Sequence, residues 1–371
     1  MADLVRMETL FTDMLKINSP SKKERGMADY TTQFLKSIGF DVYEDDASGN
    51  ISGDAGNVIG FRKGSKTGPA LLFSCHIDTV EPTETLTIVR DGDEFRSDGT
   101  TILGADDKAG VAAVLEGLRL AVESGEELPN IQVIFDVAEE IGLLGCRELD
   151  RSAIKADVAY VFDTEKPVGG ITLSAPTQAN IHITIEGVAT HAGLAPEKGI
   201  SAIVAASNAI AKMKLGRLDD ETTANIGIIN GGRAGNIVPD SVKIKAEARS
   251  RNESKLEAQI VHMKELFESE AKAIGAKATV EVNKEFRAFQ WTAEDTVVKM
   301  ASKACKQIGL PVVLQQGGGG SDANVFNTIG LPAVVIGVGY EGAHSRSEHV
   351  SLTDLLKAAE CVKALATCDP D

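Results

Sequence analysis

Short runs of apolar residues that end in acidic or histidine side chains recur in the first half of the chain. Residues 131–137 form such a run, and Glu139-Glu140 follows it after Ala138. Apolar runs of this length predict buried strands, and residues 69–75 and 157–163 show the same pattern. A helical pattern over residues 107–124 separates the strands 69–75 and 131–137. We therefore predict an α/β domain with a mostly parallel central sheet flanked by helices.

Three local patterns predict how neighbouring elements connect. Residues 57–63 and 69–75 are predicted to pair as strands joined by the turn 64–68, and Asp91-Gly92 predicts a second hairpin. Ser21-Lys22-Lys23-Glu24 matches a capping box, in which serine and glutamate side chains bond to backbone N–H groups at a helix start. It predicts a helix that ends near Ile38.

The pattern changes after residue 176, where apolar and polar residues alternate strictly over 181–186. A helix near 200–213, two strands, a long amphipathic helix near 253–273 and a last strand near 277–286 follow. This β-α-β-β-α-β order is typical of a split βαβ sandwich. We therefore predict a small α+β domain, residues 177–288, inserted into a discontinuous larger domain, residues 1–176 and 289–371.

Composition excludes several classes of partner. The chain of 371 residues is too long for one typical core, which agrees with two domains. Its net charge of −16 argues against nucleic acid or an anionic membrane as partner, and no apolar run is long enough to cross a bilayer. The five cysteines are scattered without metal-binding spacing, which favours free thiols in a reducing cytoplasm.

Six residues that could bind metal ions or move protons occur just after predicted strands or at a helix start. They are His76, Asp106, Glu139, Glu140, Asp163 and His344. Each has an ordinary structural explanation on its own, because acids favour the first turn of a helix and aspartate is a common N-cap. Together they indicate one site, because ligand sites of open α/β sheets form outside the carboxyl ends of the strands.

The residue types indicate a metal-dependent hydrolytic centre. Two imidazoles and three or more carboxylates are the set expected for two metal ions with one bridging oxygen ligand. The set contains no cysteine, which disfavours a structural zinc site, and its oxygen-rich character leaves manganese and cobalt beside zinc. Of two adjacent acids such as Glu139 and Glu140, one can bind metal while the other carries protons. Asp78 lies two residues after His76, so in extended backbone it can orient the imidazole.

The sequence resembles the di-zinc exopeptidase and aminoacylase family of metallopeptidases, and its peptidase T branch most. The matching stretches, in the same order, are Ser74-Cys75-His76-Ile77-Asp78-Thr79, Gly104-Ala105-Asp106-Asp107-Lys108-Ala109-Gly110, Glu139-Glu140, Asp163, and His344 four residues before Glu348. The resemblance covers roughly residues 4–366. It implies that His76 and Asp163 bind one ion, that Glu140 and His344 bind the other, and that Asp106 bridges them.

The resemblance also implies roles outside the ligand set. Asp78 would orient His76, and Glu139 would be the general base that takes a proton from the bridging water and passes it to the leaving amine. A cis peptide bond is expected between Asp106 and Asp107. The branch often has glycines after the third terminal ligand, whereas Thr164-Glu165 follows Asp163 here, so Glu165 stays an alternative ligand.

The smaller domain resembles the lid and dimerisation domain of the family, which implies a homodimer. His191 matches the histidine that stabilises the oxyanion, Asn236 an asparagine that contacts substrate, and Arg249 an arginine that grips a substrate carboxylate. Without the resemblance these would be a loop histidine, a turn residue and a surface charge. The backbone amides of Gly320 and Ser321 precede a short helix and could hold a carboxylate, although glycine flexibility explains the stretch equally well.

The expected function is that of a cytoplasmic exopeptidase with two divalent ions, zinc first, that releases the N-terminal residue of short peptides through a metal-bridging hydroxide. An N-acyl amino acid deacylase or a carboxypeptidase would use the same ligands and remains the alternative. A peptide-binding protein without catalysis is the remote alternative, because it would be expected to have lost a ligand or the base. Family tripeptidases tend to be longer than this chain, which leaves the substrate length open.

Overall fold

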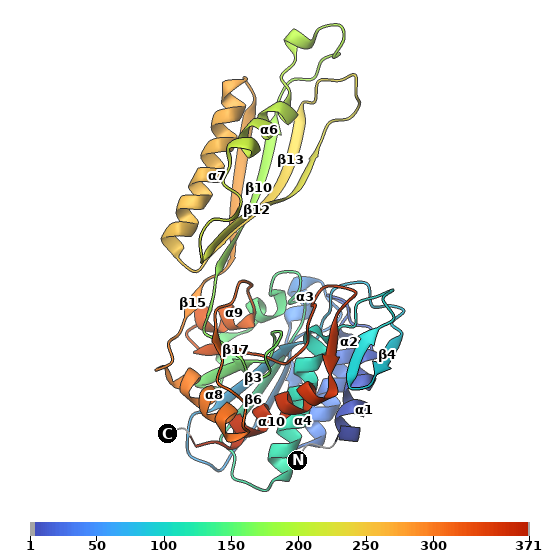
Figure 1. The fold of residues 1–371 in the computed structure, drawn as a ribbon, viewed down its shortest axis with the longest axis vertical. Helices are drawn as coiled ribbons and strands as arrows, with labels where there is room; N and C mark the ends of the chain where they lie inside the picture. The colour runs from blue at the N-terminus through green and yellow to red at the C-terminus, as the bar shows by residue number, and fades with distance from the viewer. Residues whose placement is uncertain (1–3, 370–371) are drawn as a thin grey trace. The chain divides into compact units, whose positions relative to one another are not determined.

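The computed structural model describes residues 4–369 and divides into two compact units (Figure 1). Unit 1 consists of Met1–Ser174, Trp291–Gly317 and Ser321–Asp371, and unit 2 of Ala175–Gln290 and Gly318–Gly320. The two-residue strands β9 (Ser174–Ala175) and β15 (Phe289–Gln290) stand where the chain passes from one unit to the other. Each unit has its own hydrophobic core.

Unit 1 is built on an eight-stranded sheet with the order β1-β2-β6-β3-β7-β17-β8-β16. The strands are β1 (Asp41–Glu44), β2 (Val58–Arg62), β6 (Ile131–Asp136), β3 (Leu71–His76), β7 (Val158–Val161), β17 (Ala333–Ile336), β8 (Ile171–Thr172) and β16 (Leu314–Gln315). The four central strands β6, β3, β7 and β17 are parallel. Every residue of these four strands is buried, as their continuous apolar sequences require.

Helices flank this sheet, and the predicted α/β architecture is confirmed. The helices of unit 1 are α1 (Leu4–Leu15), α2 (Arg25–Ser37), α3 (Ala47–Ile51), α4 (Ala105–Glu123), α5 (Leu144–Glu148), the 3-10 helix η1 (Arg151–Ala153), α8 (Thr296–Gln307), α9 (Asp322–Thr328) and α10 (Leu352–Thr367). Helix α4 packs on β3, α1 and α10 and is buried on nearly all sides (Figure 1). A small sheet of β4 (Ile88–Asp91), β5 (Glu94–Ser97) and β18 (His349–Ser351) contains the predicted Asp91-Gly92 hairpin.

Two predicted connections are wrong. Strands β2 and β3 do not pair, because β6 lies between them, antiparallel to β2 and parallel to β3. The turn 64–68 lies beside the segment that leads into β6, where the N–H of Ser65 donates to the carbonyl of Leu128 at 3.0 Å. The capping box is not formed either: α2 begins at Arg25, and Glu24 at its N-cap makes no cap hydrogen bond.

Unit 2 is an antiparallel sheet with the order β11-β12-β13-β10-β14, covered by two helices (Figure 1). Its elements are β10 (Thr177–Glu186), the 3-10 helix η2 (Pro196–Lys198), α6 (Ala202–Lys212), β11 (Gly216–Arg217), β12 (Thr222–Gly231), β13 (Ser241–Ser250), α7 (Glu253–Ala273) and β14 (Lys277–Phe286). The predicted β-α-β-β-α-β order is confirmed, with the short β11 added. Within residues 4–369, no helix combines the length and hydrophobicity needed to span a bilayer.

The close contact between α4 and α10 can be tested at Gly117. A Cβ atom there would lie 2.5 Å from the backbone oxygen of Ala359 and 2.5 Å from the Cβ of Val362. Gly117→Ala should lower the free energy of unfolding, measured by urea denaturation, by about 1–3 kcal/mol because the helices must move apart. Gly49 in α3 is the matched control, because a Cβ there meets nothing within 4 Å. Gly49→Ala should be neutral or stabilising by up to about 1 kcal/mol, and equal losses in the two variants would contradict the packing argument.

Candidate metal centre

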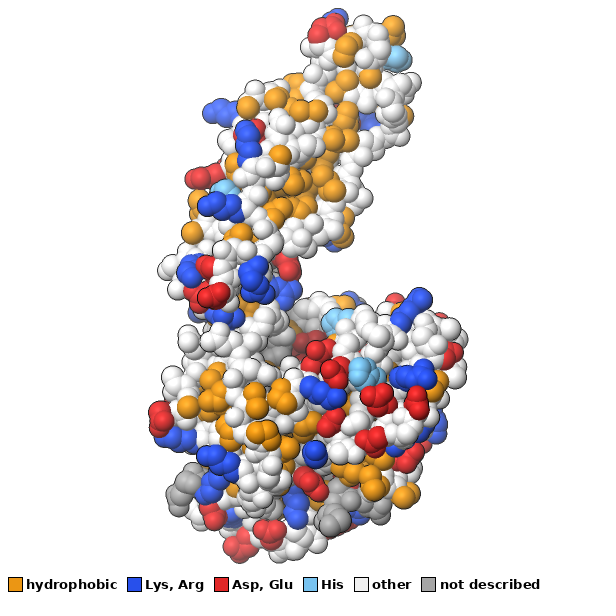
Figure 2. All heavy atoms as spheres, viewed as in Figure 1, with side chains coloured by type: hydrophobic (Ala, Val, Ile, Leu, Met, Phe, Trp, Pro, Cys, Tyr) orange, Lys and Arg blue, Asp and Glu red, His pale blue; other side chains and the backbone are white. Residues whose placement is uncertain are grey.

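The carboxyl ends of the parallel strands bring the predicted residues to one edge of the sheet. His76 is the last residue of β3, Glu139 and Glu140 follow β6, Asp163 follows β7, and His344 lies on the loop after β17. Because these four strands are neighbours, residues far apart in the sequence meet there. Figure 2 shows acidic and histidine side chains gathered on the surface of unit 1.

Asp106 lies at the centre of this group. It stands at the start of α4 in a non-helical conformation, and the expected cis peptide bond to Asp107 is present. Its Oδ1 is 3.2 Å from His76 Nε2, and its Oδ2 is 3.3 Å from His344 Nε2. His76 Nε2 is also 3.8 Å from Asp163 Oδ1, and His344 Nε2 is 2.8 Å from Glu140 Oε2. Each oxygen of Asp106 therefore lies beside a different imidazole, and each imidazole lies beside a further carboxylate.

Electrostatics make this group a fit for divalent cations. Burial raises the pKa of Asp163 well above its ordinary value, with the neighbouring charge of Asp106 adding to the effect. Burial also works to raise the pKa of Asp106, but hydrogen bonds to His344 and His76 outweigh it and lower that pKa. Hydrogen bonds to Asp106 and Glu140 raise the pKa of His344 to about 10. The carboxylates thus stabilise positive charge on the imidazoles. Bound metal ions can supply the same positive charge.

Ligand-atom distances support the same conclusion. One ligand atom each from His76, Asp106 and Glu140 can be chosen so that all lie within 4.8 Å of one another, and the same is true of His76, Asp107 and Asp163. All are imidazole nitrogens or carboxylate oxygens, the donors that zinc, cobalt and manganese accept. Asp107 is fully buried, and its Oδ2 has no hydrogen-bond partner among residues 4–369.

Asp78 contacts both His76 and the loop after β6. The contact with His76 is the one that the two-residue spacing predicted. Its Oδ1 lies 3.4 Å from His76 Nδ1, and its backbone oxygen lies 3.0 Å from the same nitrogen. The backbone N–H groups of Glu139 and Glu140 donate to its two carboxylate oxygens at 3.0 and 3.3 Å. One buried carboxylate thus fixes the imidazole orientation and the backbone of both acids.

Two further side chains belong to the site: Tyr340, which carried no recognisable signal in the sequence, and Glu348, which the sequence marked only as part of a matching stretch. The hydroxyl of Tyr340, on the loop after β17, lies within hydrogen-bond distance of two carboxylate oxygens, 3.2 Å from Asp106 Oδ1 and 3.1 Å from Asp163 Oδ1. The fully buried Glu348 accepts the N–H of Gly104 at 2.7 Å and the N–H of Asp106 at 2.8 Å. Glu348 thereby joins the loop that carries His344 to the loop that carries Asp106.

The alternative ligand Glu165 lies apart from this group. It is exposed, and its Oε1 accepts the backbone N–H of Ala343 at 3.0 Å. The side chain of Asp163, by contrast, is only 10% exposed and lies beside His76. The geometry favours Asp163.

The remaining predicted residues lie in unit 2 or at its boundary. His191 is exposed, and its Nδ1 accepts the N–H of Gly193 at 3.2 Å. Asn236 lies close to His191, because the backbone carbonyl of Asn236 accepts the N–H of Ala192. Arg249 is bound to Glu247, with Nε and Nη2 donating at 3.2 and 3.0 Å.

Gly320 and Ser321 have structural explanations. A Cβ at Gly320 would lie 2.0 Å from the Cζ of Phe286, so the close approach of the ring requires glycine. The backbone N–H of Ser321 donates to Asn324 Oδ1 at 3.1 Å within the start of α9. The amide of Ser321 is thus engaged within the chain, and binding of a substrate carboxylate by Gly320 and Ser321 stays a prediction.

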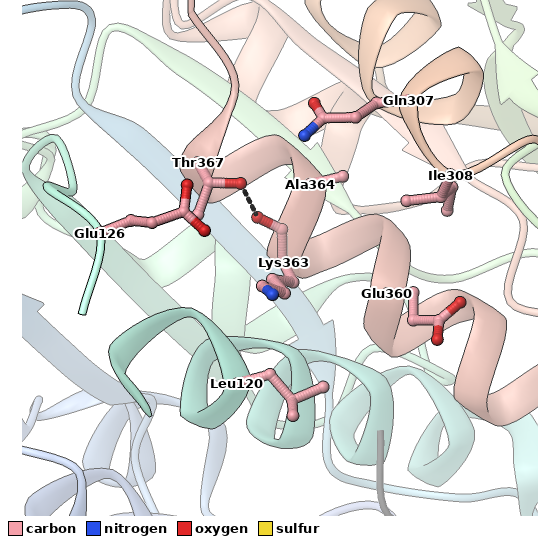
Figure 3. A pocket seen from close by; sticks show the side chains of 8 residues that line it. All are labelled: Leu120, Glu126, Gln307, Ile308, Glu360, Lys363, Ala364 and Thr367. Carbon is pink, nitrogen blue, oxygen red and sulfur yellow. Dashed lines mark hydrogen bonds between the residues drawn. The ribbon is translucent and has the colours of Figure 1, made fainter. Parts of the chain in front are cut away.

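A separate hollow of about 310 Å³ in unit 1 carries no comparable group (Figure 3). It is lined by Leu120 of α4, Gln307 of α8, Glu360 and Lys363 of α10, and Glu126, among others. Leu120 lies roughly 20 Å along α4 from Asp106, from the rise of a helix. The hollow is therefore no part of the metal-ligand group.

Comparison with known proteins identifies the family. The profile of peptidase family M20/M25/M40 matches residues 72–367. The chain belongs to this family. The crystal structure of aminopeptidase PepT from Bacillus cereus is 43% identical, with a TM-score of 0.91, and the match covers 99% of this chain and 98% of that one. A tripeptidase from Staphylococcus aureus is 37% identical, with a TM-score of 0.95 and the same coverage.

A third relative has a different activity in its name. Carboxypeptidase G2 from a Pseudomonas species is 32% identical over 86% of this chain and 78% of its own length. The resemblance seen in the sequence is confirmed, and the chain is a metal-dependent exopeptidase of the M20/M25/M40 family.

The choice between Asp163 and Glu165 predicts how much metal two variants bind. Asp163→Ala should reduce the bound metal from two ions to one, because it removes a donor beside His76. Glu165→Ala should leave both ions bound, because its carboxylate faces the backbone of Ala343. Metal content after dialysis, measured by inductively coupled plasma mass spectrometry, checks both variants. The reverse result would make Glu165 the ligand.

Proposed function

We propose that this exopeptidase releases the N-terminal residue of short free peptides and uses two divalent ions, zinc first and cobalt or manganese as alternatives. The observation that carries the proposal is the position of Asp106, whose two oxygens lie beside two different histidines. The proposed ligands are His76 and Asp163 for one ion, Glu140 and His344 for the other, and Asp106 for both. Similarity to an aminopeptidase over nearly the whole chain supports the direction of cleavage.

Ions bound there would polarise the scissile carbonyl and make a water molecule a strong nucleophile near neutral pH. The protein's own contribution to proton transfer is assigned to Glu139. Burial raises the pKa of Glu139 well above its ordinary value, and the charges of Asp163 and Glu140 act in the same direction. A carboxyl group with a raised pKa suits a residue that takes a proton from water and passes it to the leaving amine.

Substrate contacts are proposed for three residues of unit 2. His191 would donate to the oxyanion, Asn236 would contact the peptide, and Arg249 would bind a substrate carboxylate. Arg249 presents the planar fork that such binding needs. Because this fork is bound to Glu247, a substrate carboxylate must compete with that glutamate.

A homodimer through unit 2 and a cytoplasmic location complete the proposal. Apolar side chains of α6 and β12 are exposed on unit 2, namely Ile203, Val204, Ile228 and Ile229, and Figure 2 shows hydrophobic side chains gathered on one face of this unit. Exposed apolar patches of this kind are typical of protein interfaces. All five cysteines are free and buried, as expected in a reducing compartment.

The second candidate is cleavage from the carboxyl end or of an N-acyl amino acid, favoured by the similarity to carboxypeptidase G2. The same ligands and the same base would serve this reaction, so a substrate panel separates the candidates. We expect the metal-loaded protein to release N-terminal residues from free di- and tripeptides and to leave N-blocked peptides and N-acetyl amino acids intact. Amino-acid analysis of the products is the measurement, and cleavage of the blocked compounds alone would establish the second candidate.

The role of Glu139 predicts a variant that binds metal without turnover. Glu139→Gln should lower kcat by about 10²–10⁴-fold, the usual contribution of a general base, because the amide cannot accept the proton. Its metal content should stay at the wild-type level, since Glu139 is outside the proposed ligand set. Glu126→Gln, in the remote hollow, is the matched control and should keep the wild-type kcat. A Glu139→Gln variant with near wild-type kcat would refute the role.

A further inference from the structure

The segment Asn18–Glu24, between α1 and α2, lies against the carboxyl end of β3. The N–H of Thr79 donates to the carbonyl of Ser19 at 3.0 Å, and Pro20 forms an isolated bridge with Thr79. This segment contains the serine and glutamate that resemble a capping box. Neither of them caps α2, and their side chains have other partners.

Glu24 binds the backbone immediately before the general base. The side chain is fully buried, and its Oε1 accepts the N–H of Lys22 at 2.6 Å and the N–H of Ala138 at 3.1 Å. Its Oε2 is buried and has no partner among the described residues. Ala138 has a φ of +55°, a left-handed conformation that residues other than glycine rarely adopt. Glu24 therefore supports an unfavourable backbone conformation directly before Glu139.

Ser21 reaches the other side of Glu139 through Asp78. Its hydroxyl donates to Asp78 Oδ2 at 2.6 Å, and Asp78 accepts the N–H groups of Glu139 and Glu140. The segment thus fixes the backbone of three consecutive residues, 138 to 140. Glu24 and Ser21, which do this, precede residues 138–140 by more than a hundred positions in the sequence.

We propose that Glu24 is a positioning residue for Glu139, and that Ser21 assists it through Asp78. The proposal rests on the role of Glu139 as the general base. Hydrogen bonds of this kind orient groups that act in catalysis, and their loss typically costs about 10- to 100-fold in activity or metal affinity.

Support of α2 alone does not explain the burial of Glu24. The first N–H of the helix, that of Arg25, donates to Asp54 Oδ1 at 3.0 Å, and the side chain of Glu24 makes no cap hydrogen bond. Burial, together with the charge of Asp78, raises the pKa of Glu24 to about 7. A glutamine keeps one acceptor oxygen for both N–H groups, so it can replace this glutamate.

Three variants test the proposal by steady-state kinetics and metal analysis. Glu24→Ala should lower kcat by about 10- to 100-fold while KM and metal content stay near the wild-type values. Glu24→Gln should restore kcat, because both donors of Glu24 use the same oxygen. Asp54→Ala is the matched control: it removes a hydrogen bond at the start of the same helix, makes no contact with residues 138–140, and should keep the wild-type kcat.

Hydrogen–deuterium exchange gives a measurement that does not depend on activity. In Glu24→Ala, the amides of residues 138–140 should exchange faster than in wild type, and in Asp54→Ala they should not. Ser21→Ala should give a smaller change in both exchange and kcat, and it decides the question if Glu24→Ala does not fold. Altered exchange in a protein that cleaves no peptide would refute the proposed function but not the positioning.

Three results would overturn the proposal. The first is unchanged exchange and kcat in Glu24→Ala, or in Ser21→Ala where the former does not fold. The second is a Glu24→Gln variant as impaired as Glu24→Ala, because the acceptor oxygen would then not be what matters. The third is an Asp54→Ala variant with the same loss of kcat, which would reduce Glu24 to general support of α2.

Discussion

The carboxylate of Asp106 is the group on which the arrangement of the site depends. Its two oxygens face different histidines, at 3.2 Å from His76 and 3.3 Å from His344. One carboxylate makes both contacts, so its position depends on the groups that hold its backbone. Glu348 does this by accepting the N–H groups of Gly104 and of Asp106 itself. The backbone of Asp106 is thus held by a residue outside the proposed ligand set.

The same device recurs around the site. Asp78, Glu348 and Glu24 are buried carboxylates, and each accepts backbone N–H groups from a loop that carries a proposed ligand or the general base. A carboxylate oxygen accepts hydrogen bonds, so these side chains suit places where several N–H groups converge. Burial of an acid is costly unless such donors surround it. Hydrogen bonds to backbone make these acids tolerable and fix the loops in the same step.

The sequence predicted the parts of this structure that depend on local pattern. The apolar runs ending at His76 and before Glu139 had to be buried strands, and parallel neighbours bring their carboxyl ends together. It did not predict that β6 lies between β2 and β3, because strand order depends on contacts between distant residues. Tyr340 was not predicted either, because it follows an apolar strand and no neighbouring polar residue marks it as part of a site. Glu24 matched a capping box in the local sequence. Only its hydrogen bond to the distant Ala138 shows that it belongs to the site.

The separation of the ligands along the chain explains why the supports bind backbone instead of ligand side chains. The proposed ligands come from β3, the start of α4, the loop after β6, the residue after β7 and the loop after β17. Acids gathered from so many elements repel one another until cations bind, so the loops need support that is independent of metal. Supports that take up backbone N–H groups leave the carboxylate and imidazole atoms free to face the ions. Ions that bind only this arrangement then stabilise the folded chain by mass action.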